Sequence, residues 1–112
     1  MTISNFYENT TKIFDVTIYY DGVLADISAD TVTLYIKEKF TDADDESIVT
    51  SVADVATAGA SGVATFTLSD DDTDIPIRKY HLEIVWETDA GYRFVVHQQT
   101  ISCLNKLQDN DA

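Results

Sequence analysis

Cysteine, proline and basic side chains are scarce in this chain of 112 residues. The single cysteine, Cys103, has no second cysteine to pair with, which excludes a secreted mini-domain held by internal disulfides. Seven lysines and arginines stand against 20 aspartates and glutamates, so the net charge is −13. Because such a surface has no basic patch to neutralise phosphates, we expect neither nucleic acid nor a membrane as a partner.

Long apolar runs and glycine-rich loops are missing as well. No stretch is long enough to span a bilayer, and the N-terminal segment MTISNFYENT has no apolar signal-peptide core. We therefore expect a protein that stays in a cytosol or travels inside a larger assembly. The four glycines form no phosphate-binding loop, and no nucleophile-elbow motif occurs. These absences predict a protein that is not an enzyme and uses no cofactor.

The sequence is instead rich in segments that alternate apolar and polar residues, a pattern typical of strands with one buried face. The segment 79–87, KYHLEIVWE, is the clearest of them. Outward positions on the segment 31–39 are expected at Thr33, Tyr35 and Lys37. The residues expected to face the core are Phe14, Val16, Ile18, Tyr20, Val32, Leu34, Ile36, Ala64, Phe66, Leu68, Tyr80, Leu82, Ile84 and Trp86.

Turn signals separate these segments. Asp21-Gly22 is a two-residue hairpin signal, and TDAG at 88–91 predicts a second turn. About seven or eight short strands between turns predict an all-β fold, most simply an antiparallel β-sandwich, with a small closed barrel as the alternative. Residues 1–104 are expected to form one domain and residues 105–112 a polar C-terminal tail.

Two acidic clusters need an explanation. The first contains Asp70, Asp71, Asp72 and Asp74 and lies just before the only proline, Pro76. Calcium takes carboxylate ligands, but the spacing does not fit an EF-hand loop. Aspartates that accept hydrogen bonds from backbone amides in a turn are the favoured interpretation, and no metal site is predicted.

The second cluster contains Asp42, Asp44, Asp45 and Glu46, and it is expected to be a solvated loop. The two histidines, His81 and His97, form no zinc-binding set with Cys103, and His81 is expected on an outward face. Tyr80 and Trp86 share one face of a strand. This favours a place in the core over a sugar-binding platform.

Two longer segments resemble a known family. The segments are GVLADISADTVTLYIKEK at 22–39 and SGVATFTLSDDDTDIPIRKYHLEIVWETDAGYRFVV at 61–96. They are similar to the immunoglobulin-like N-terminal domain of phage baseplate upper proteins and related virion modules. Arg78-Lys79 and Ser28-Ala29 stand where the family has glycines. The matching residues are Asp26, Ile27, Val32, Ile36, Lys37, Gly62, Leu68, Asp72, Thr73 and Tyr80.

The resemblance implies an immunoglobulin-like sandwich and a non-enzymatic virion structural protein of a tail, baseplate, neck or head accessory. Its expected partners are other phage virion proteins and further copies of itself in a symmetric oligomer. Its expected location is the virion, and the host cytoplasm during assembly. The candidate assembly surface consists of Tyr19, Tyr35, Asp70, Asp71 and Asp72. Because little of the chain lies outside the domain, a small stand-alone component is expected.

Two other functions are open at this point. A carbohydrate- or cell-surface-binding sandwich module would use aromatic side chains, and calcium on the acidic clusters would assist it. A small hydrolase with scattered carboxylates is the least favoured, because the sequence shows no combination of nucleophile, base and orienting group.

Overall fold

A computed structural model describes residues 2–105 and shows an all-β protein, as predicted. The expected C-terminal tail lies outside these residues, apart from Asn105. No helix between residues 2 and 105 is long and apolar enough to cross a membrane. The elements are β1 (Phe6–Tyr7), β2 (Lys12–Thr17), β3 (Tyr19–Tyr20), β4 (Val23–Leu24), β5 (Thr31–Lys37), η1 (Asp44–Glu46), β6 (Val49–Val52), η2 (Gly59–Ser61), β7 (Val63–Leu68), β8 (Lys79–Glu87) and β9 (Arg93–Leu104).

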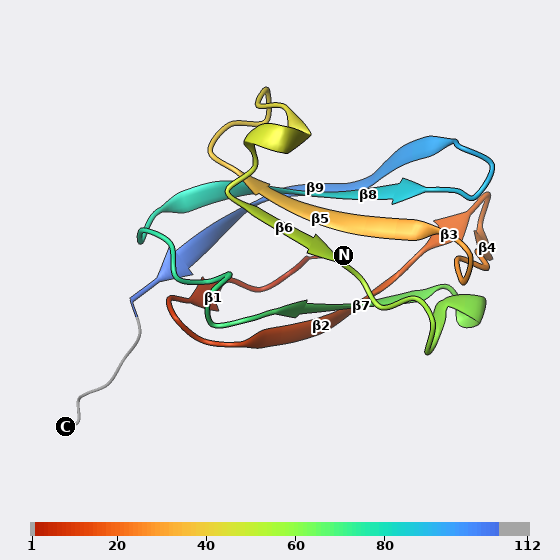
Figure 1. Cartoon of the computed structure of the whole chain (residues 1–112), viewed down its shortest axis with the longest axis horizontal. Coiled ribbons are helices and arrows are strands. Elements are labelled where there is room, and N and C mark those ends of the chain that lie inside the picture. Colours follow the sequence, from red (N-terminus) through yellow and green to blue (C-terminus); the bar gives the residue numbers. More distant parts are fainter. Residues whose placement is uncertain (1, 106–112) are drawn as a thin grey trace.

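Five strands form one sheet in the order β1-β9-β8-β5-β6, while β2 pairs with β7 and β3 with β4 (Figure 1). Every pairing is antiparallel except that of β1 with β9, where Phe6 lies opposite Cys103 in parallel register. The sheet is therefore mixed rather than wholly antiparallel as predicted. The cause is local, because β1 adds to the edge of β9 before the chain crosses to β2.

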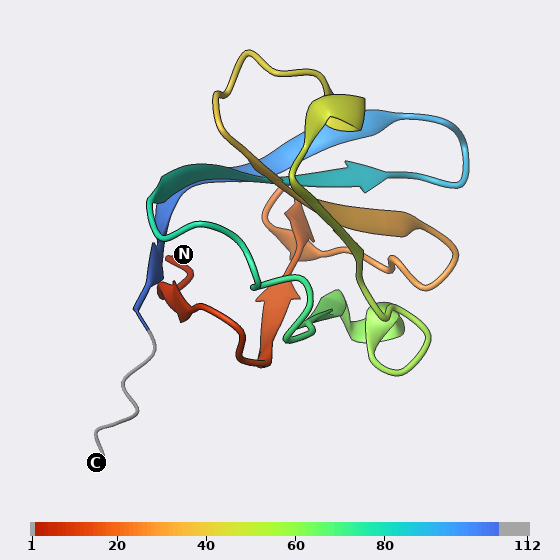
Figure 2. The same ribbon diagram turned by 60° about the vertical axis from the view of Figure 1, so that its left-hand side comes forward.

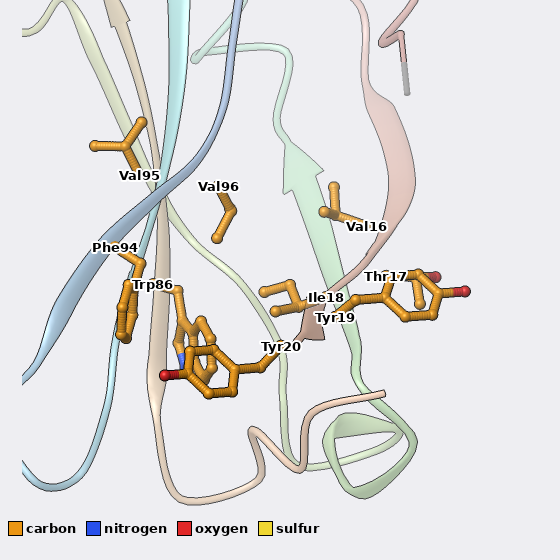
Figure 3. Close-up of a pocket in the computed structure, with 9 residues that line it drawn as sticks. All are labelled: Val16, Thr17, Ile18, Tyr19, Tyr20, Trp86, Phe94, Val95 and Val96. Atoms are coloured by element: carbon orange, nitrogen blue, oxygen red, sulfur yellow. The ribbon is translucent and has the colours of Figure 1, made fainter. Parts of the chain in front are cut away.

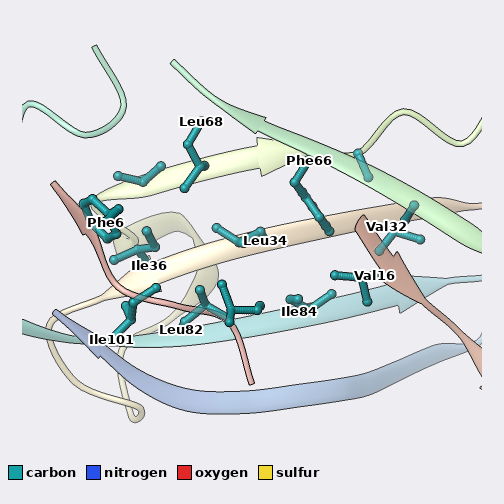
Figure 4. Packing of buried hydrophobic residues seen from close by; sticks show 14 of the residues in the cluster. Phe6, Val16, Val32, Leu34, Ile36, Phe66, Leu68, Leu82, Ile84 and Ile101 are labelled. Carbon is teal, nitrogen blue, oxygen red and sulfur yellow. The ribbon is translucent and has the colours of Figure 1, made fainter. Parts of the chain in front are cut away.

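The core lies between the five-stranded sheet and the β2–β7 pair. Figure 2 shows the sheet curling over this pair. Figure 4 shows side chains from both sides meeting between the strands, including Phe66 of β7 and Leu34 of β5. The large side chains that are almost completely buried are Phe6, Val16, Ile27, Val32, Leu34, Ile36, Phe66, Leu68, Tyr80, Leu82, Ile84 and Ile101.

Alternation predicted most of this core correctly, with three exceptions. Thr33 and Lys37, predicted to face outward, are 6% and 3% exposed. Both lie on β5, a strand with neighbours on either side, and Asp44 from the loop after it contacts Lys37. Tyr20, predicted to face the core, is 57% exposed, because the chain turns into the β3–β4 hairpin before this position.

Both predicted turns form. Asp21 and Gly22 have φ values of 54° and 80°, as a tight two-residue hairpin between β3 and β4 requires. In the second turn, the backbone N–H of Thr88 donates to the carbonyl of Tyr92, and that of Gly91 donates to the carbonyl of Thr88. This second turn connects β8 to β9 and borders the site described next.

Candidate functional site

A groove of about 390 Å³ lies between β2 and β9, and we call it the β2–β9 groove (Figure 3). Apart from Thr17, all of its lining residues are aliphatic or aromatic. In Figure 3, the side chains of Ile18 and Val96 approach each other across it from opposite sides. The lining residues are Val16, Thr17, Ile18, Tyr19, Tyr20, Trp86, Phe94, Val95 and Val96.

Three aromatic rings form one end of this groove. The ring centroids of Trp86 and Phe94 are 5.1 Å apart, and Tyr20 lies 6.0 Å from Trp86 and 5.7 Å from Phe94. A second hollow of about 300 Å³ shares these three rings and extends to Tyr92. Tyr19 and Tyr92 are 61% and 67% exposed, so a large apolar surface is open to a partner.

The groove lies between two strand edges that have no backbone partner within residues 2–105. Strand β2 pairs only with β7, and the pairing of β9 with β1 is confined to Cys103 and Leu104. The N–H of Ile18 donates to Gly62 beyond the end of the β2–β7 ladder. Because hydrogen bonding alternates along an antiparallel ladder, the backbone groups of Asp15 and Thr17 point away from β7.

The same alternation applies to β9. The backbone hydrogen bond from Thr88 to Tyr92 shows which opposite residues of β8 and β9 are hydrogen-bonded to each other. Arg93 and Val95 fall on the alternate positions, so their backbone N–H and C=O groups point away from β8. A β-bulge follows, because Val85 pairs with Val95 whereas Ile84 pairs with His97. Val96 is thus the extra residue, and it is partly buried against the core.

Three carboxylates adjoin the lining of the β2–β9 groove along the chain, and we call them its acidic rim. Asp15 precedes Val16 on β2, Asp21 follows Tyr20 in the hairpin turn, and Asp89 lies in the turn between β8 and β9. Arg93 at the start of β9 is already paired with Asp44. The rim therefore favours a cationic partner.

A buried ion-pair network covers the other face of the sheet. Lys37 Nζ donates to Asp44 Oδ1 at 2.8 Å and to Glu83 Oε1 at 3.1 Å. Burial lowers the pKa of Lys37, but its bonds to the two carboxylates outweigh burial and raise that pKa. The bond from Lys37 holds the pKa of Asp44 below its usual value, despite partial burial. The two carboxylates therefore hold Lys37 as a cation.

This network corrects the prediction that the 42–46 cluster is only solvated. Asp44 binds Lys37 and Arg93, whereas Asp45 is exposed. Tyr35 lies nearby on β5, and burial followed by the charge of Asp44 raises its pKa. The acidic segment 42–46 thus contributes a structural contact to the sheet through Asp44.

The first acidic cluster forms a turn, as predicted. The N–H of Ser69 donates to Asp72 Oδ2 at 2.9 Å, and the N–H of Asp72 donates to Ser69 Oγ at 3.1 Å. Thr73 is fully buried, and its hydroxyl donates to the carbonyl of Thr10 at 2.6 Å. In the described part of the chain, no three His, Cys, Asp or Glu side chains are arranged to hold a metal ion.

The five predicted assembly residues do not form one surface. Tyr19 lines the β2–β9 groove, Tyr35 is half-buried on the opposite face of the sheet, and Asp70–Asp72 lie in the turn after β7. The prediction missed most of the groove. Its one signal is the run Phe94-Val95-Val96, which breaks the alternation of β9 where the bulge occurs.

The remaining candidate side chains have structural roles. Trp86 is 6% exposed and Tyr80 is fully buried, so both belong to the core, as predicted. His81 is partly buried rather than on an open face, and its ring packs tilted against Phe40 with centroids 4.0 Å apart. Cys103 is 1% exposed, and burial, followed by the charge of Glu8, raises the pKa of its thiol.

His97 has no metal-binding geometry either. Its Nε2 forms a 2.7 Å hydrogen bond with Oε1 of Gln99, whose amide group binds the N-terminal segment. Comparisons with protein-family models, with curated proteins and with solved structures found no match to this chain.

Proposed function

We propose that this chain is a non-enzymatic structural protein of a bacteriophage particle, in the tail, baseplate, neck or as a head accessory. It works through protein–protein contacts. The observation that carries the proposal is the β2–β9 groove, an open apolar surface with aromatic side chains beside two unpaired strand edges. Tyrosine, tryptophan and phenylalanine are enriched at protein interfaces, and free strand edges are templates for pairing. The sequence resemblance supports the phage assignment.

The fold we propose is an immunoglobulin-like sandwich. Strands β9, β8, β5 and β6 occupy the positions of G, F, C and C′, and β2 and β7 those of B and E. The hydrogen-bonded order of the sheet and the antiparallel β2–β7 pair support this assignment. The segment between β6 and β7 forms only the bridge of Asp54 with Thr65, where such domains often have another strand.

Two side-chain environments favour a binding role over covalent catalysis. Lys37 is held as a cation by Asp44 and Glu83, and the thiol of Cys103 is buried with a raised pKa. Nucleophilic catalysis needs the opposite, a lowered pKa and access to substrate.

Mass spectrometry of purified particles, from the phage whose genome encodes this chain, tests the proposal. We expect the chain at a fixed ratio to the other particle proteins, in several symmetric copies. A phage from which the gene is deleted should give defective particles, and plasmid-borne wild-type chain should restore them. Particles that lack the chain and remain infectious without its gene would refute the proposal.

A further inference from the structure

We propose that the β2–β9 groove binds an extended segment of a neighbouring virion protein, which adds as a strand along β9 at residues 93–98. This inference rests on the proposed function and specifies how the contact is made. Its partner has apolar side chains at alternate positions and basic residues flanking them. Three features of the groove lead to this partner: its edge, its lining and its charge.

The edge of β9 already accepts a strand from its own chain. Strand β1 pairs with Cys103 and Leu104, and the side chain of Gln99 continues this contact towards the groove. Its Oε1 accepts from the N–H of Ile3 at 2.8 Å, and its Nε2 donates to the carbonyl of Ile3 at 2.8 Å. Within residues 2–105 no strand continues this contact beyond Gln99, so the edge of β9 from Arg93 to Gln98 has no backbone partner there.

The lining selects the side chains of the added strand. Successive residues of a strand point to opposite faces, so alternate side chains of the partner enter the groove. They meet Val16 and Ile18 on one wall and Trp86 and Phe94 on the other. Apolar residues at every second position satisfy this lining, and the intervening residues face solvent.

Charge selects the partner over a second copy of this chain. The rim carries Asp15, Asp21 and Asp89, no lysine or arginine is among the lining residues, and Arg93 is bound to Asp44. Each copy has a net charge of −13, so two copies repel each other at a groove with an acidic rim. A segment flanked by lysine or arginine is attracted instead.

A peptide of valine alternating with threonine, ending in lysine at both termini, is the probe. It is titrated against the full chain, and the fluorescence of Trp86, the only tryptophan, reports binding. We expect saturable binding and slower amide hydrogen exchange at residues 93–98. The same peptide with glutamate termini should bind about tenfold more weakly. No binding of the lysine peptide, or equal binding of both, would overturn the inference.

Val95→Lys is the matched variant, and Val52→Lys is its control. Both valines are exposed, at 48% and 63%. Val52 lies on the edge strand β6, and Val95 lies on the part of β9 that β1 does not pair with. Lysine on an edge blocks strand addition, and at position 95 it also repels a basic partner. We expect Val95→Lys to weaken peptide binding about tenfold and Val52→Lys to leave it unchanged. Unfolding curves should show that both variants fold.

Cross-linking in assembled particles distinguishes a failure of this inference from a failure of the proposed function. A photo-reactive phenylalanine analogue at position 95 should cross-link, in assembled particles, to a basic extended segment of a different protein. A cross-link to a second copy, or none while the wild-type chain is present, overturns the inference and leaves the structural role standing. Absence of the wild-type chain from particles removes the structural role itself.

Discussion

The indole Nε1 of Trp86 donates a 2.8 Å hydrogen bond to Oδ2 of Asp30. The other oxygen of the same carboxylate accepts the backbone N–H of Asp89 at 2.8 Å. Asp30 thus connects the segment before β5 to the end of β8 and to the turn that follows it. These contacts fix the aromatic end of the β2–β9 groove, because Trp86 packs against both Tyr20 and Phe94 there.

We expect Asp30→Ala to lower the free energy of unfolding by about 1 kcal/mol, because it removes the acceptor of the partly buried indole N–H, whereas the exposed backbone N–H of Asp89 can turn to water. Urea unfolding followed by the fluorescence of Trp86 measures this loss. Asp89→Ala, which removes an exposed side chain but keeps the backbone donor, should cost less than about 0.5 kcal/mol. Equal midpoints for Asp30→Ala and wild type would contradict the role given to Asp30.

Sequence alternation predicted the strands and most of the core because burial repeats with a period of two on each strand. It could not predict the Trp86–Asp30 bond, which joins residues 56 positions apart. It also could not predict that both faces of β5 would be covered. Lys37 is polar and obeys the outward pattern, yet the 38–48 loop folds back over it. Such cover depends on tertiary contacts that a local pattern does not contain.

We expect Lys37→Met to destabilise the protein by about 3 kcal/mol, because it leaves the carboxylate of Glu83 buried without its cation. Chemical denaturation measures the loss. The double variant Lys37→Met/Glu83→Leu should recover much of it, since replacing a whole buried ion pair with apolar side chains is often neutral. A double variant as unstable as the sum of both single variants would contradict this explanation.

The unfolding free energy should depend on pH through Asp44. Its pKa is lowered from 3.8 in the folded state, so its contribution is present above that pH and is lost as pH falls through the folded value. The pKa of Lys37 is raised from 10.5, so its contribution is present below 10.5 and is lost as pH rises through the folded value.

Unfolding free energies measured across the acid range test this dependence. Asp44→Asn should reduce the loss of stability below about pH 4, since the variant has no carboxylate to protonate there. Asp45→Asn, one position away on the exposed side of the same 3₁₀ turn, is the control and should behave as wild type. An acid limb unchanged in Asp44→Asn would show that other groups dominate it.

The groove was harder to predict than the core, because its residues come from segments that are distant in sequence. Tyr20 looks like an ordinary core residue by alternation, and only the fold shows that no strand formed by residues 2–105 covers the side between β2 and β9. The outward positions of the alternating segments instead predict an assembly surface of Tyr19 and Tyr35, together with the acidic turn Asp70–Asp72. Of these, only Tyr19 lies at the groove.

The acidic turn yields a prediction about individual aspartates. Asp72→Ala should cost about 1 kcal/mol, because the carboxylate of Asp72 caps the N–H of Ser69. Asp71→Ala removes an exposed carboxylate and should change stability by less than about 0.5 kcal/mol. Adding calcium should leave the melting temperature of the wild-type chain unchanged. A calcium-dependent rise that Asp71→Ala abolishes would instead show a cation site in this turn.

Two glycines with the same backbone conformation allow the cost of backbone strain to be measured separately from the cost of steric contact at an added Cβ. Gly22 and Gly62 have φ values of 80° and 81°, which are unfavourable for any L-residue with a Cβ. A Cβ at position 22 would meet nothing within 4 Å, whereas one at position 62 would lie 3.0 Å from the backbone oxygens of Ala25 and Ile18. Those oxygens belong to the chain on either side of the β3–β4 hairpin, so they cannot move without displacing a wall of the β2–β9 groove.

Gly22→Ala should therefore lower the free energy of unfolding by about 1 kcal/mol, because only the left-handed backbone conformation is unfavourable for alanine there. Gly62→Ala should cost clearly more, since the same backbone term is joined by two close contacts with carbonyl oxygens. If the hairpin shifts to relieve these contacts, Gly62→Ala should also weaken binding of the lysine-flanked peptide, whereas Gly22→Ala should not. Urea unfolding gives the first difference and the peptide titration the second. Equal destabilisation by the two substitutions would contradict this explanation. It would mean that the carbonyl groups of Ile18 and Ala25 can be displaced at little cost in free energy.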